Sequence, residues 1–382
     1  MGHKILFNDE TSKSITNKSY IASIIIPVSN NYIILEYFIE HLTRTIYMNN
    51  YQIIFVIDGY VDCKIFEILN KYSLKYPNVN CVQSYKKTSY AYVNNYGRTF
   101  ATTDLLIFMN TDIFLQENCL EIMVDSLHKN NVQAIQPLLI YPQTNCVQST
   151  GHIFGDCFNR HALNGQSIEH PLVAQSATRQ ALSLALCLIP TAIFDECNGF
   201  DEYYYNGWEG LDLTLKITQR GYLCWYESEA RAYHIEGGSR KKFSLNESLQ
   251  AGHFWSKWGH IVKSDIIDLL KKQVCNIDTS KEYIVYDFTT YRSWRAILNK
   301  LHILYEDIID KTQYSNEQIL DFYNVLSYQA LISTDPILFL VTSFSCLKDN
   351  NLWIKYRKNN GDMFIDLSGN IGFVQEIVCG NN

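Results

Sequence analysis

Short, wholly apolar segments alternate with amphipathic segments through the first 110 residues. The apolar segments predict four buried strands, at residues 21–27, 53–57, 79–82 and 104–109. Between them, residues 35–42 and 65–76 carry apolar side chains three and four positions apart, which predicts helices. Strands that lack polar alternation are typical of parallel sheets with helices on both faces. This region is therefore predicted to be an α/β domain.

Acidic residues follow two of these strands. Asp58 comes directly after the second strand, and Asp112 follows the fourth strand together with Asn110 and Thr111. Ligands of parallel sheets bind beyond the carboxyl ends of the strands, so both carboxylates are expected there. Asp112 suits a divalent cation held against a diphosphate, with a capped turn as the alternative. Asp58 could accept a hydrogen bond from a base imide or a ribose hydroxyl, or belong to an ordinary Asp-Gly turn.

The pattern changes after residue 130. Short segments follow, with one helix expected at residues 211–220, and from residue 263 a second strand–helix alternation begins. This alternation predicts strands at residues 283–288, 306–310, 336–341 and 363–367, and helices at residues 293–304, 317–332 and 352–357. The turn at residues 287–292 contains no glycine, so no dinucleotide site is expected in it.

A chain of 382 residues usually exceeds one compact core. We therefore predict a flexible lead at residues 1–20, a sheet domain at residues 21–262 and a small Rossmann-like α/β domain at residues 263–382. The last domain follows the predicted catalytic region in the sequence, which suggests acceptor binding or association as its role.

Composition limits the classes of partner. Apolar residues make up 47% of the chain and the net charge is −7, which indicates a globular protein that does not bind nucleic acid. The 11 cysteines form no C-x-x-C pair and read as reduced thiols, which predicts a cytoplasmic protein. The apolar run at residues 181–190 is too short to span a bilayer. Membrane contact is expected to be peripheral at most, at the inner face of the membrane.

A second polar group of residues lies between positions 208 and 240. Glu209 and Asp212 are three residues apart at a predicted helix start, where they either balance the helix dipole or supply a general base. Trp208 could stack on a sugar. His234 precedes a Gly-Gly-Ser-Arg-Lys-Lys stretch, which contains Arg240 and suits phosphate.

Eight segments together resemble, in order, the motifs of the family 2 glycosyltransferases of the GT-A fold. IIIPV at 24–28 resembles the opening strand, VIDGYVD at 56–62 resembles V-D-D-G-S-x-D, AYVNNYG at 91–97 resembles A-x-x-x-N-x-G, and LIFMNTD at 106–112 resembles the metal motif L-x-F-L-N-x-D. NGFDE at 198–202 resembles G-G-F-D-E, WEGLDL at 208–213 resembles W-E-D-V-D-L, HIEGGS at 234–239 resembles H-x-x-G-x-S, and FWSKW at 254–258 resembles F-x-x-K-W.

This resemblance implies a GT-A-like nucleotide-sugar-binding sheet domain followed by the small Rossmann-like domain. It implies transfer of a sugar from a nucleotide-diphosphate donor, in particular a UDP-sugar, to a hydroxyl with inversion, in bacterial surface glycan assembly. The acceptor would be a glycan, a lipid-linked glycan or a peptide. Mn²⁺ or Mg²⁺ would be held by Asp112 and His234. The expected donor contacts are Pro27, Val28, Asp58, Asn95, Asn110, Thr111, Trp208 and Arg240.

Two positions depart from the family pattern. Ile57 replaces one of the paired aspartates, and Gly210 replaces the acidic residue that usually serves as the base. Either Glu209 or Asp212 would then be the base, and Glu209 is favoured because it is expected in the loop before the helix. Three alternatives remain: a protein or peptide glycosyltransferase, a nucleotidyltransferase, and a sugar-nucleotide-binding protein with weak or no catalysis.

Overall fold

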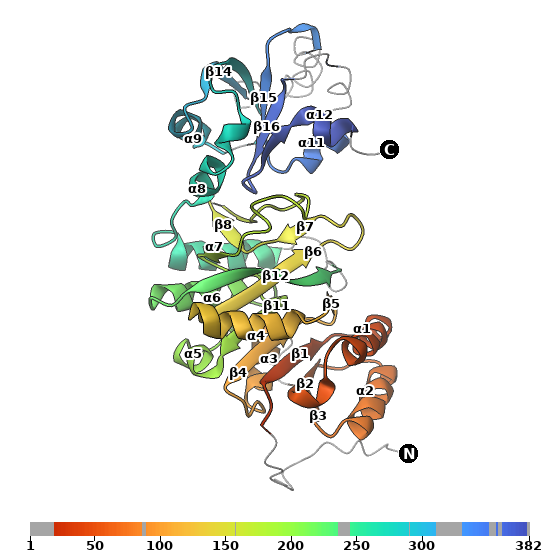
Figure 1. The fold of residues 1–382 in the computed structure, drawn as a ribbon. Helices are drawn as coiled ribbons and strands as arrows, with labels where there is room; N and C mark the ends of the chain where they lie inside the picture. Colours follow the sequence, from red (N-terminus) through yellow and green to blue (C-terminus); the bar gives the residue numbers. More distant parts are fainter. Residues whose placement is uncertain are drawn as a thin grey trace. The chain divides into compact units, whose positions relative to one another are not determined.

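The computed structural model describes residues 19–85, 89–156, 158–235, 245–289, 291–310, 331–350, 357 and 361–379 (Figure 1). The chain splits into two compact units. The first unit contains residues up to His152 and Ile168–His260, and the second contains Ile153–Ser167 and Ile261–Asn382.

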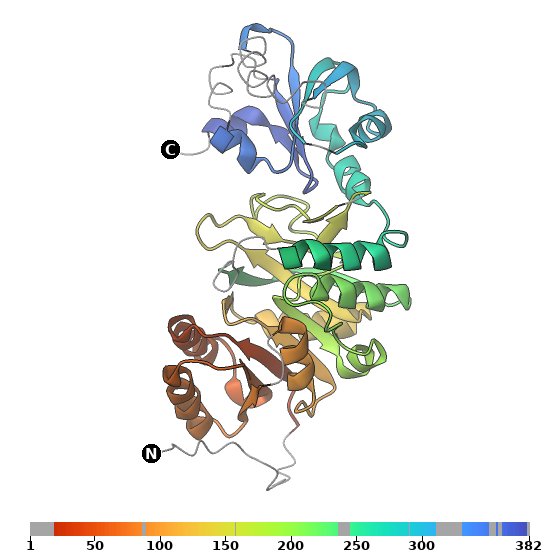
Figure 2. The same cartoon turned by 180° about the vertical axis from the view of Figure 1, so that it is seen from behind.

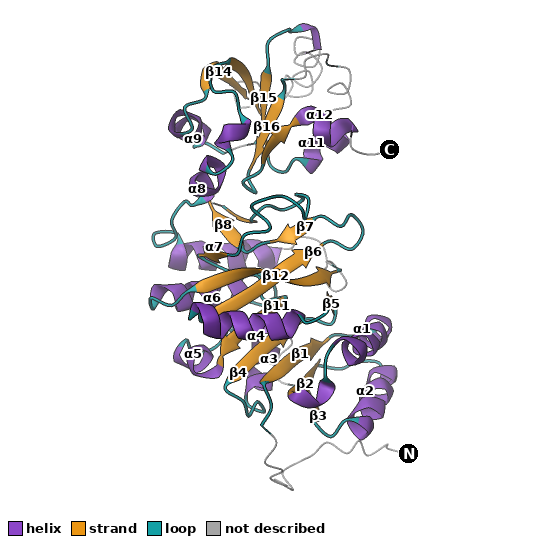
Figure 3. Ribbon diagram, in the orientation of Figure 1, coloured by secondary structure: helices purple, strands orange, loops and turns teal. Residues whose placement is uncertain are grey.

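A ten-stranded sheet forms the centre of the first unit (Figure 3). Its strands are β1 (Ala22–Val28), β2 (Tyr51–Asp58), β3 (Val79–Ser84), β4 (Leu105–Met109), β5 (Ile113–Leu115), β6 (Ala134–Ile140), β7 (Val147–Ser149), β10 (Ala177–Arg179), β11 (Leu186–Pro190) and β12 (Cys224–His234). The order along the sheet is β10-β12-β6-β11-β4-β1-β2-β3, with β5 paired to β12 and β7 to β6.

Helices cover both faces of this sheet. They are α1 (Tyr32–Thr45), α2 (Cys63–Lys75), α3 (Tyr90–Arg98), α4 (Cys119–Asn130), α5 (Thr191–Glu196), α6 (Glu209–Gln219) and α7 (Leu245–Trp258). One core contains Ile24 and Ile26 of β1 with apolar residues of α1, α2 and α4, whereas Ile25 belongs to a core with α3, α5 and α6. Burial of both strand faces explains why β1 lacks polar alternation.

Close contact between α3 and the sheet requires a glycine. A Cβ atom at Gly97 would lie 2.6 Å from Ile25 Cγ2 and 2.8 Å from Val56 Cγ2. The helix therefore approaches β1 and β2 more closely than a side chain would allow, which gives a physical reason for the glycine of the AYVNNYG segment.

The predicted α/β fold is confirmed, and its sheet is mixed rather than wholly parallel. Strands β3, β2, β1 and β4 are parallel, but β11 runs antiparallel to both β4 and β6. The sequence pattern did not predict β6, β11, β12, α4 or α7. An apolar run such as β11 reads the same in either direction, so its sequence does not reveal an antiparallel strand.

The second unit contains a five-stranded sheet of order β14-β13-β15-β16-β17, of which only the last pairing is antiparallel. Its strands are β13 (Glu282–Asp287), β14 (Leu304–Asp310), β15 (Ile337–Val341), β16 (Met363–Asp366) and β17 (Ile371–Phe373), and β8 (His152–Phe154) pairs with β9 (Asn159–His161). Its helices are α8 (Ile266–Lys271), α9 (Trp294–Lys300), α11 (Ser345–Asn350) and α12 (Val374–Cys379). The view in Figure 2 shows this sheet from behind.

Two details of this unit differ from expectation. Helix α9 ends at Lys300, so residues 301–304 were wrongly included in it, and β14 begins two residues earlier than predicted. Most of the helices expected at residues 317–332 and 352–357 lies outside the described residues.

Residues 153–167 belong to the second unit, although more than 90 residues separate them from its other segment. Asn370, which is fully buried, donates a hydrogen bond from Nδ2 to Asn164 O at 2.9 Å. Leu163 N donates to Ser368 O at 2.9 Å, and Phe154 N donates to Asp265 Oδ1 at 2.7 Å. The segment therefore completes the hydrogen bonding of the turn that follows β16.

We expect Asn370→Ala to lower the free energy of unfolding of the second unit by about 1–3 kcal/mol, because it removes the hydrogen bonds that the buried Asn370 side chain donates to Asn164 O and Asp366 Oδ2. Hydrogen exchange in β15 and β16, followed by mass spectrometry under mild urea, measures the change. The exposed Asn276 provides the matched control, Asn276→Ala. Equal exchange in the two variants would contradict a stabilising role for this contact.

Candidate active site

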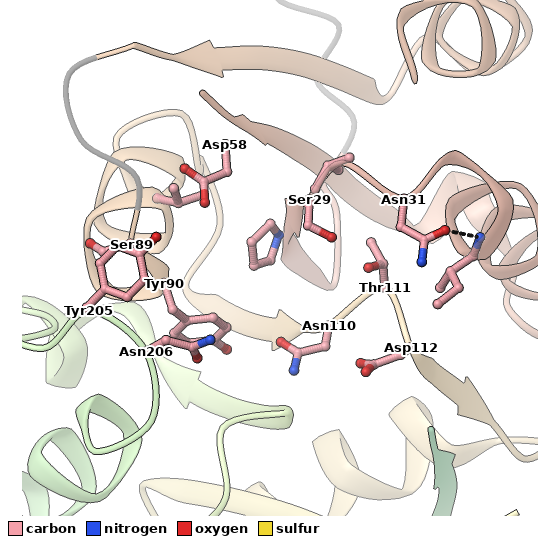
Figure 4. A pocket seen from close by; sticks show the side chains of 14 residues that line it. Ser29, Asn31, Asp58, Ser89, Tyr90, Asn110, Thr111, Asp112, Tyr205 and Asn206 are labelled. Carbon is pink, nitrogen blue, oxygen red and sulfur yellow. Dashed lines mark hydrogen bonds between the residues drawn. The ribbon is translucent and has the colours of Figure 1, made fainter. Parts of the chain in front are cut away.

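A cavity of about 230 Å³ lies at the carboxyl edge of the parallel strands in the first unit (Figure 4). Six residues that the sequence assigned to the site line it together: Pro27, Val28, Asp58, Asn110, Thr111 and Asp112. The ends of β1, β2 and β4 bring them together because these neighbouring strands are parallel.

Two buried acceptor atoms in this cavity lack a hydrogen-bond partner among the described residues. They are Asp58 Oδ1 and Asn110 Oδ1. Burial raises the pKa of the Asp58 carboxyl from 3.8 to about 6. Buried acceptors are usually satisfied, so unsatisfied ones that line a cavity indicate a place for a donor group from a ligand.

Asp112 and His234 meet although 121 residues separate them in the chain. Strands β12 and β5 are antiparallel with His234 opposite Ile113, which sets the histidine beside the residue before β5. His234 Nε2 lies 3.3 Å from Asp112 Oδ1, and His234 Nδ1 lies 2.7 Å from Gln148 Oε1. If Nδ1 carries the proton that Gln148 accepts, a neutral His234 turns a lone pair toward the carboxylate. Such a pair of facing acceptors is stable only with a cation, a proton or a metal ion, between them.

Asp212 lies away from this cavity, in the interface between α6 and α7. Its carboxylate is fully buried, and Oδ1 accepts hydrogen bonds from Lys257 Nζ at 2.5 Å and Trp258 Nε1 at 2.8 Å. Lys216 Nζ lies 3.1 Å from Oδ2. Lys257 also contacts Asp201 at 3.3 Å. The WEGLDL and FWSKW segments thus meet in one ion-pair network that holds the two helices together.

Helix α6 begins at Glu209, two residues earlier than expected, because Trp208 O already accepts from Asp212 N. The expectation that Glu209 lies in the loop before the helix is therefore wrong. Glu209 is 6% exposed, and its Oε2 accepts a hydrogen bond from Gly207 N at 2.6 Å. A Cβ atom at Gly210 would lie 3.0 Å from Leu184 Cδ2, so Leu184 fills the space beside this glycine.

Two of the remaining predicted donor contacts, Asn95 and Trp208, do not line the cavity. Asn95 Nδ2 donates to Phe200 O, and its Oδ1 accepts from Phe200 N, so its amide holds a loop in place. The Trp208 ring packs 4.8 Å from that of Phe254, and Trp208 is not among the residues that line the cavity. Arg240 lies outside the described residues.

Other residues of the cavity were missed by the sequence reasoning: Ser29, Asn31, Ile34, Ser89, Tyr90, Val93, Tyr205 and Asn206. Ser89 carries a recognisable signal, because it is the N-cap of α3 and its Oγ accepts from Tyr92 N. Tyr90 donates its hydroxyl to Leu184 O at 2.7 Å, and burial, followed by the charge of Glu209, raises its pKa. Tyr205 and Asn206 lie between two motif segments and carry no such signal.

We expect Asp58→Asn to stabilise the protein above pH 6 and to have little effect below pH 4. The folded pKa is raised, so the stability that the neutral carboxyl provides is lost as pH rises from 3.8 through about 6. The gain should be about 1–2 kcal/mol after allowance for residual solvent contact. Urea denaturation at pH 4 and pH 8 measures it. A gain that is equal at both pH values would rule out the buried charge as its cause.

No group of three or more His, Cys, Asp or Glu residues that could hold a metal ion occurs in the described part of the chain. Within the same residues, no helix is long and apolar enough to cross a membrane.

Residues 23–179 match the family model described as Glycosyl transferase family 2. The chain is 26% identical over 167 residues to the O-antigen biosynthesis protein RfbC of Myxococcus xanthus, which covers 42% of the chain and 13% of that protein. It is 26% identical over 230 residues to the uncharacterized protein y4gI of Sinorhizobium fredii (strain NBRC 101917 / NGR234), which covers 58% of the chain and 25% of that protein. The chain thus spans a quarter or less of the length of these relatives.

Among solved structures, GalNAc-T7 with UDP, GalNAc and Mn²⁺ is similar in fold, with a TM-score of 0.50 and 13% sequence identity over 80% of this chain and 58% of that chain. At this identity the likeness concerns the fold alone. Together with the family match, it confirms the resemblance read from the motifs: residues 23–179 are similar to glycosyl transferase family 2, and the first unit has a GT-A-type fold.

Proposed function

We propose that the protein transfers a sugar from a UDP-sugar to a hydroxyl acceptor, with inversion at the transferred carbon. The observation that carries this proposal is the cavity in which Asp58 and Asp112 converge from two strand ends of a family 2 fold. The proposal assigns the two ends of the donor to these two carboxylates.

The nucleoside end of the donor is assigned to Asp58. Its Oδ1 is buried without a partner among the described residues, and a uracil imide N–H would supply the missing donor. Pro27 and Val28 line the same cavity and offer an apolar surface for the base. The raised pKa of Asp58 implies that nucleotide affinity falls as pH drops below about 6, because the protonated carboxyl accepts less well.

The diphosphate end is assigned to Asp112, with His234. These two residues fit Mn²⁺ or Mg²⁺, because such ions take few protein ligands and leave other positions to phosphate and water. Gln148 accepts from His234 Nδ1 and leaves Nε2 facing Asp112, an arrangement typical of a histidine that binds a metal. When bound, the ion would neutralise charge on the departing diphosphate. The unpartnered Asn110 Oδ1 and Thr111 lie beside this place in the cavity wall.

The base that accepts the acceptor proton is assigned to Glu209. Asp212 is engaged by two lysines and an indole N–H, which hold its carboxylate in the interface between α6 and α7. The charge of Glu209 acts on Tyr90, a residue of the cavity wall. Glu209 is not among the residues that line the cavity, but it accepts from Gly207, the residue after the lining residue Asn206.

A biological setting is suggested by one relative, which is named as an O-antigen biosynthesis protein. We propose bacterial surface glycan assembly, on a glycan or lipid-linked glycan, with a peptide acceptor as the alternative. The second unit would bind the acceptor or another protein. A cytoplasmic location, at the inner face of the membrane, would suit a lipid-linked acceptor.

A second candidate function is sugar-nucleotide binding with weak or no catalysis. Gly210 supports it, because a glycine stands where the family usually has its base and Leu184 fills the neighbouring space. Release of UDP from UDP-sugars in the presence of MnCl₂ separates the two functions. Turnover supports the transferase, whereas binding without release supports the second candidate.

We expect Asp112→Ala to abolish the manganese dependence of UDP binding while the fold persists, because the metal loses its carboxylate ligand. Titration calorimetry with UDP, with and without MnCl₂, measures this dependence, and circular dichroism checks the fold. Asp125→Ala, at an exposed position on α4, is the control. If the variant keeps a manganese-dependent UDP affinity like that of the natural protein, Asp112 has no metal role.

Glu209→Gln should lower kcat by about a hundredfold or more with little change in donor affinity, the usual scale for loss of a general base. Glutamine can still accept from Gly207 N, so the variant tests basicity apart from loop structure. Asp212→Asn should instead lower thermal stability more than rate, because two lysines lose their buried counter-charge. Normal turnover in Glu209→Gln with an inactive but folded Asp212→Asn would reverse the assignment.

A further inference from the structure

The wall of the cavity has two parts of different origin. Twelve of its residues lie between Pro27 and Asp112, and the other two, Tyr205 and Asn206, come from the loop before α6. Figure 4 shows Tyr205 and Asn206 on the side of the cavity formed by Ser89 and Tyr90. The first part contains both carboxylates that the proposed function assigns to the nucleotide. The loop residues are therefore free to contact another part of the donor.

The backbone of this loop is held by buried side chains. Gln250 of α7 is 6% exposed, and its Oε1 accepts from Tyr205 N at 2.7 Å and from Asn206 N at 3.2 Å. Glu209 accepts from the next amide, that of Gly207. Gly207 has φ 114°, a left-handed conformation that favours glycine. Three consecutive amides are thus satisfied by side chains behind the loop.

The same loop is fixed at both of its ends. Tyr205 O accepts from Tyr90 N at 3.0 Å, which joins the loop to the first residue of α3. Upstream, the Tyr203 ring stacks on His253 with ring centroids 4.0 Å apart, and Asp201 contacts both His253 and Lys257 at 3.3 Å. An exposed segment held at so many points is preorganised, and its side chains keep one position relative to the cavity.

Asn206 combines this fixed position with an unused side chain. It is exposed and lines the cavity, and its carboxamide makes no hydrogen bond within the described residues. A carboxamide offers two donors and one acceptor, which matches the hydroxyl groups of a sugar. An epimer of the sugar that places this hydroxyl group elsewhere would leave the carboxamide unpaired, which would weaken the binding of that epimer.

We propose that Asn206 is a specificity-determining residue that recognises a hydroxyl group of the transferred sugar, and that Gln250 is the positioning residue that holds it there. This proposal rests on the proposed function, because it takes the occupant of the cavity to be a UDP-sugar.

The test measures the Kd of UDP, UDP-glucose, UDP-galactose, UDP-N-acetylglucosamine and UDP-N-acetylgalactosamine by calorimetry with MnCl₂. The natural protein should prefer one sugar nucleotide over its 4-epimer. Asn206→Ala should reduce that preference about tenfold, the scale of one hydrogen bond, and leave the Kd of UDP unchanged. Asn70→Ala, at an exposed position of α2, is the matched control.

Gln250 is tested by a pair of variants. Gln250→Leu removes the acceptor oxygen and should reduce the epimer preference like Asn206→Ala, with the Kd of UDP unchanged. Gln250→Glu keeps an acceptor oxygen and should restore the preference. Loss of UDP affinity in parallel with the preference would indicate a merely structural role and would overturn the assignment of Gln250.

The outcomes separate the two proposals. If the natural protein binds UDP but shows no epimer preference, or if Asn206→Ala keeps the full preference, the role of Asn206 is wrong and the proposed function stands. If the natural protein binds none of the five nucleotides, both are wrong.

Discussion

The cavity depends on one constraint: burying a carboxylate at the edge of a sheet costs free energy. Asp58 is the last residue of β2, and Asp112 lies between β4 and β5, so both carboxylates follow strands whose other residues are almost wholly buried. The pKa of Asp58 is raised for the same reason, because burial favours the neutral form of the carboxyl. The surrounding packing keeps the carboxylates in place despite this cost. Cores on both faces of the sheet and the close approach of α3 at Gly97 provide that packing.

A comparison of Asp212 with Asp58 shows that the role of a buried acidic residue depends on its charged partners as well as on its burial. Asp212 is more deeply buried than Asp58, yet two lysines and an indole N–H surround it. A carboxylate that is paired in this way holds the helices around it in place, because removing one partner would leave an uncompensated buried charge. The network therefore acts as a clamp between α6 and α7, and the position of Gln250 on α7 depends on that clamp.

The sequence predicted those parts of the fold and site that rest on local patterns. Apolar runs ended by Asp58 and Asp112 indicated both the strands and the edge where these residues meet. The contact of Asp112 with His234 depends on the antiparallel register of β12 and β5, which the motifs implied but no periodicity revealed. Tyr205 and Asn206 were missed because their placement depends on Gln250, a residue 44 or 45 positions later in the chain. The segment at residues 153–167 was likewise assigned to the first domain, since nothing local connects it with Ser368 or Asn370.

Gly210 and Leu184 together limit how the site of the proposed function could activate an acceptor. Leu184 lies within 3.2 Å of the place where a side chain at position 210 would begin, and the Leu184 carbonyl accepts from Tyr90, so the leucine is held at both its side chain and its backbone. An aspartate introduced at position 210 would therefore have to displace a fixed residue, and the substitution alone would not rebuild the usual base. Under the proposed function, the nucleotide side retains Asp58 and Asp112, although Ile57 replaces one of the usual paired aspartates, and the acceptor side has apolar packing beside Gly210. Under the proposed function, proton transfer from the acceptor would depend on Glu209, which also accepts a hydrogen bond from Gly207 in the loop that carries Asn206. The two proposals together would link selection of the sugar and activation of the acceptor through the buried carboxylate of Glu209.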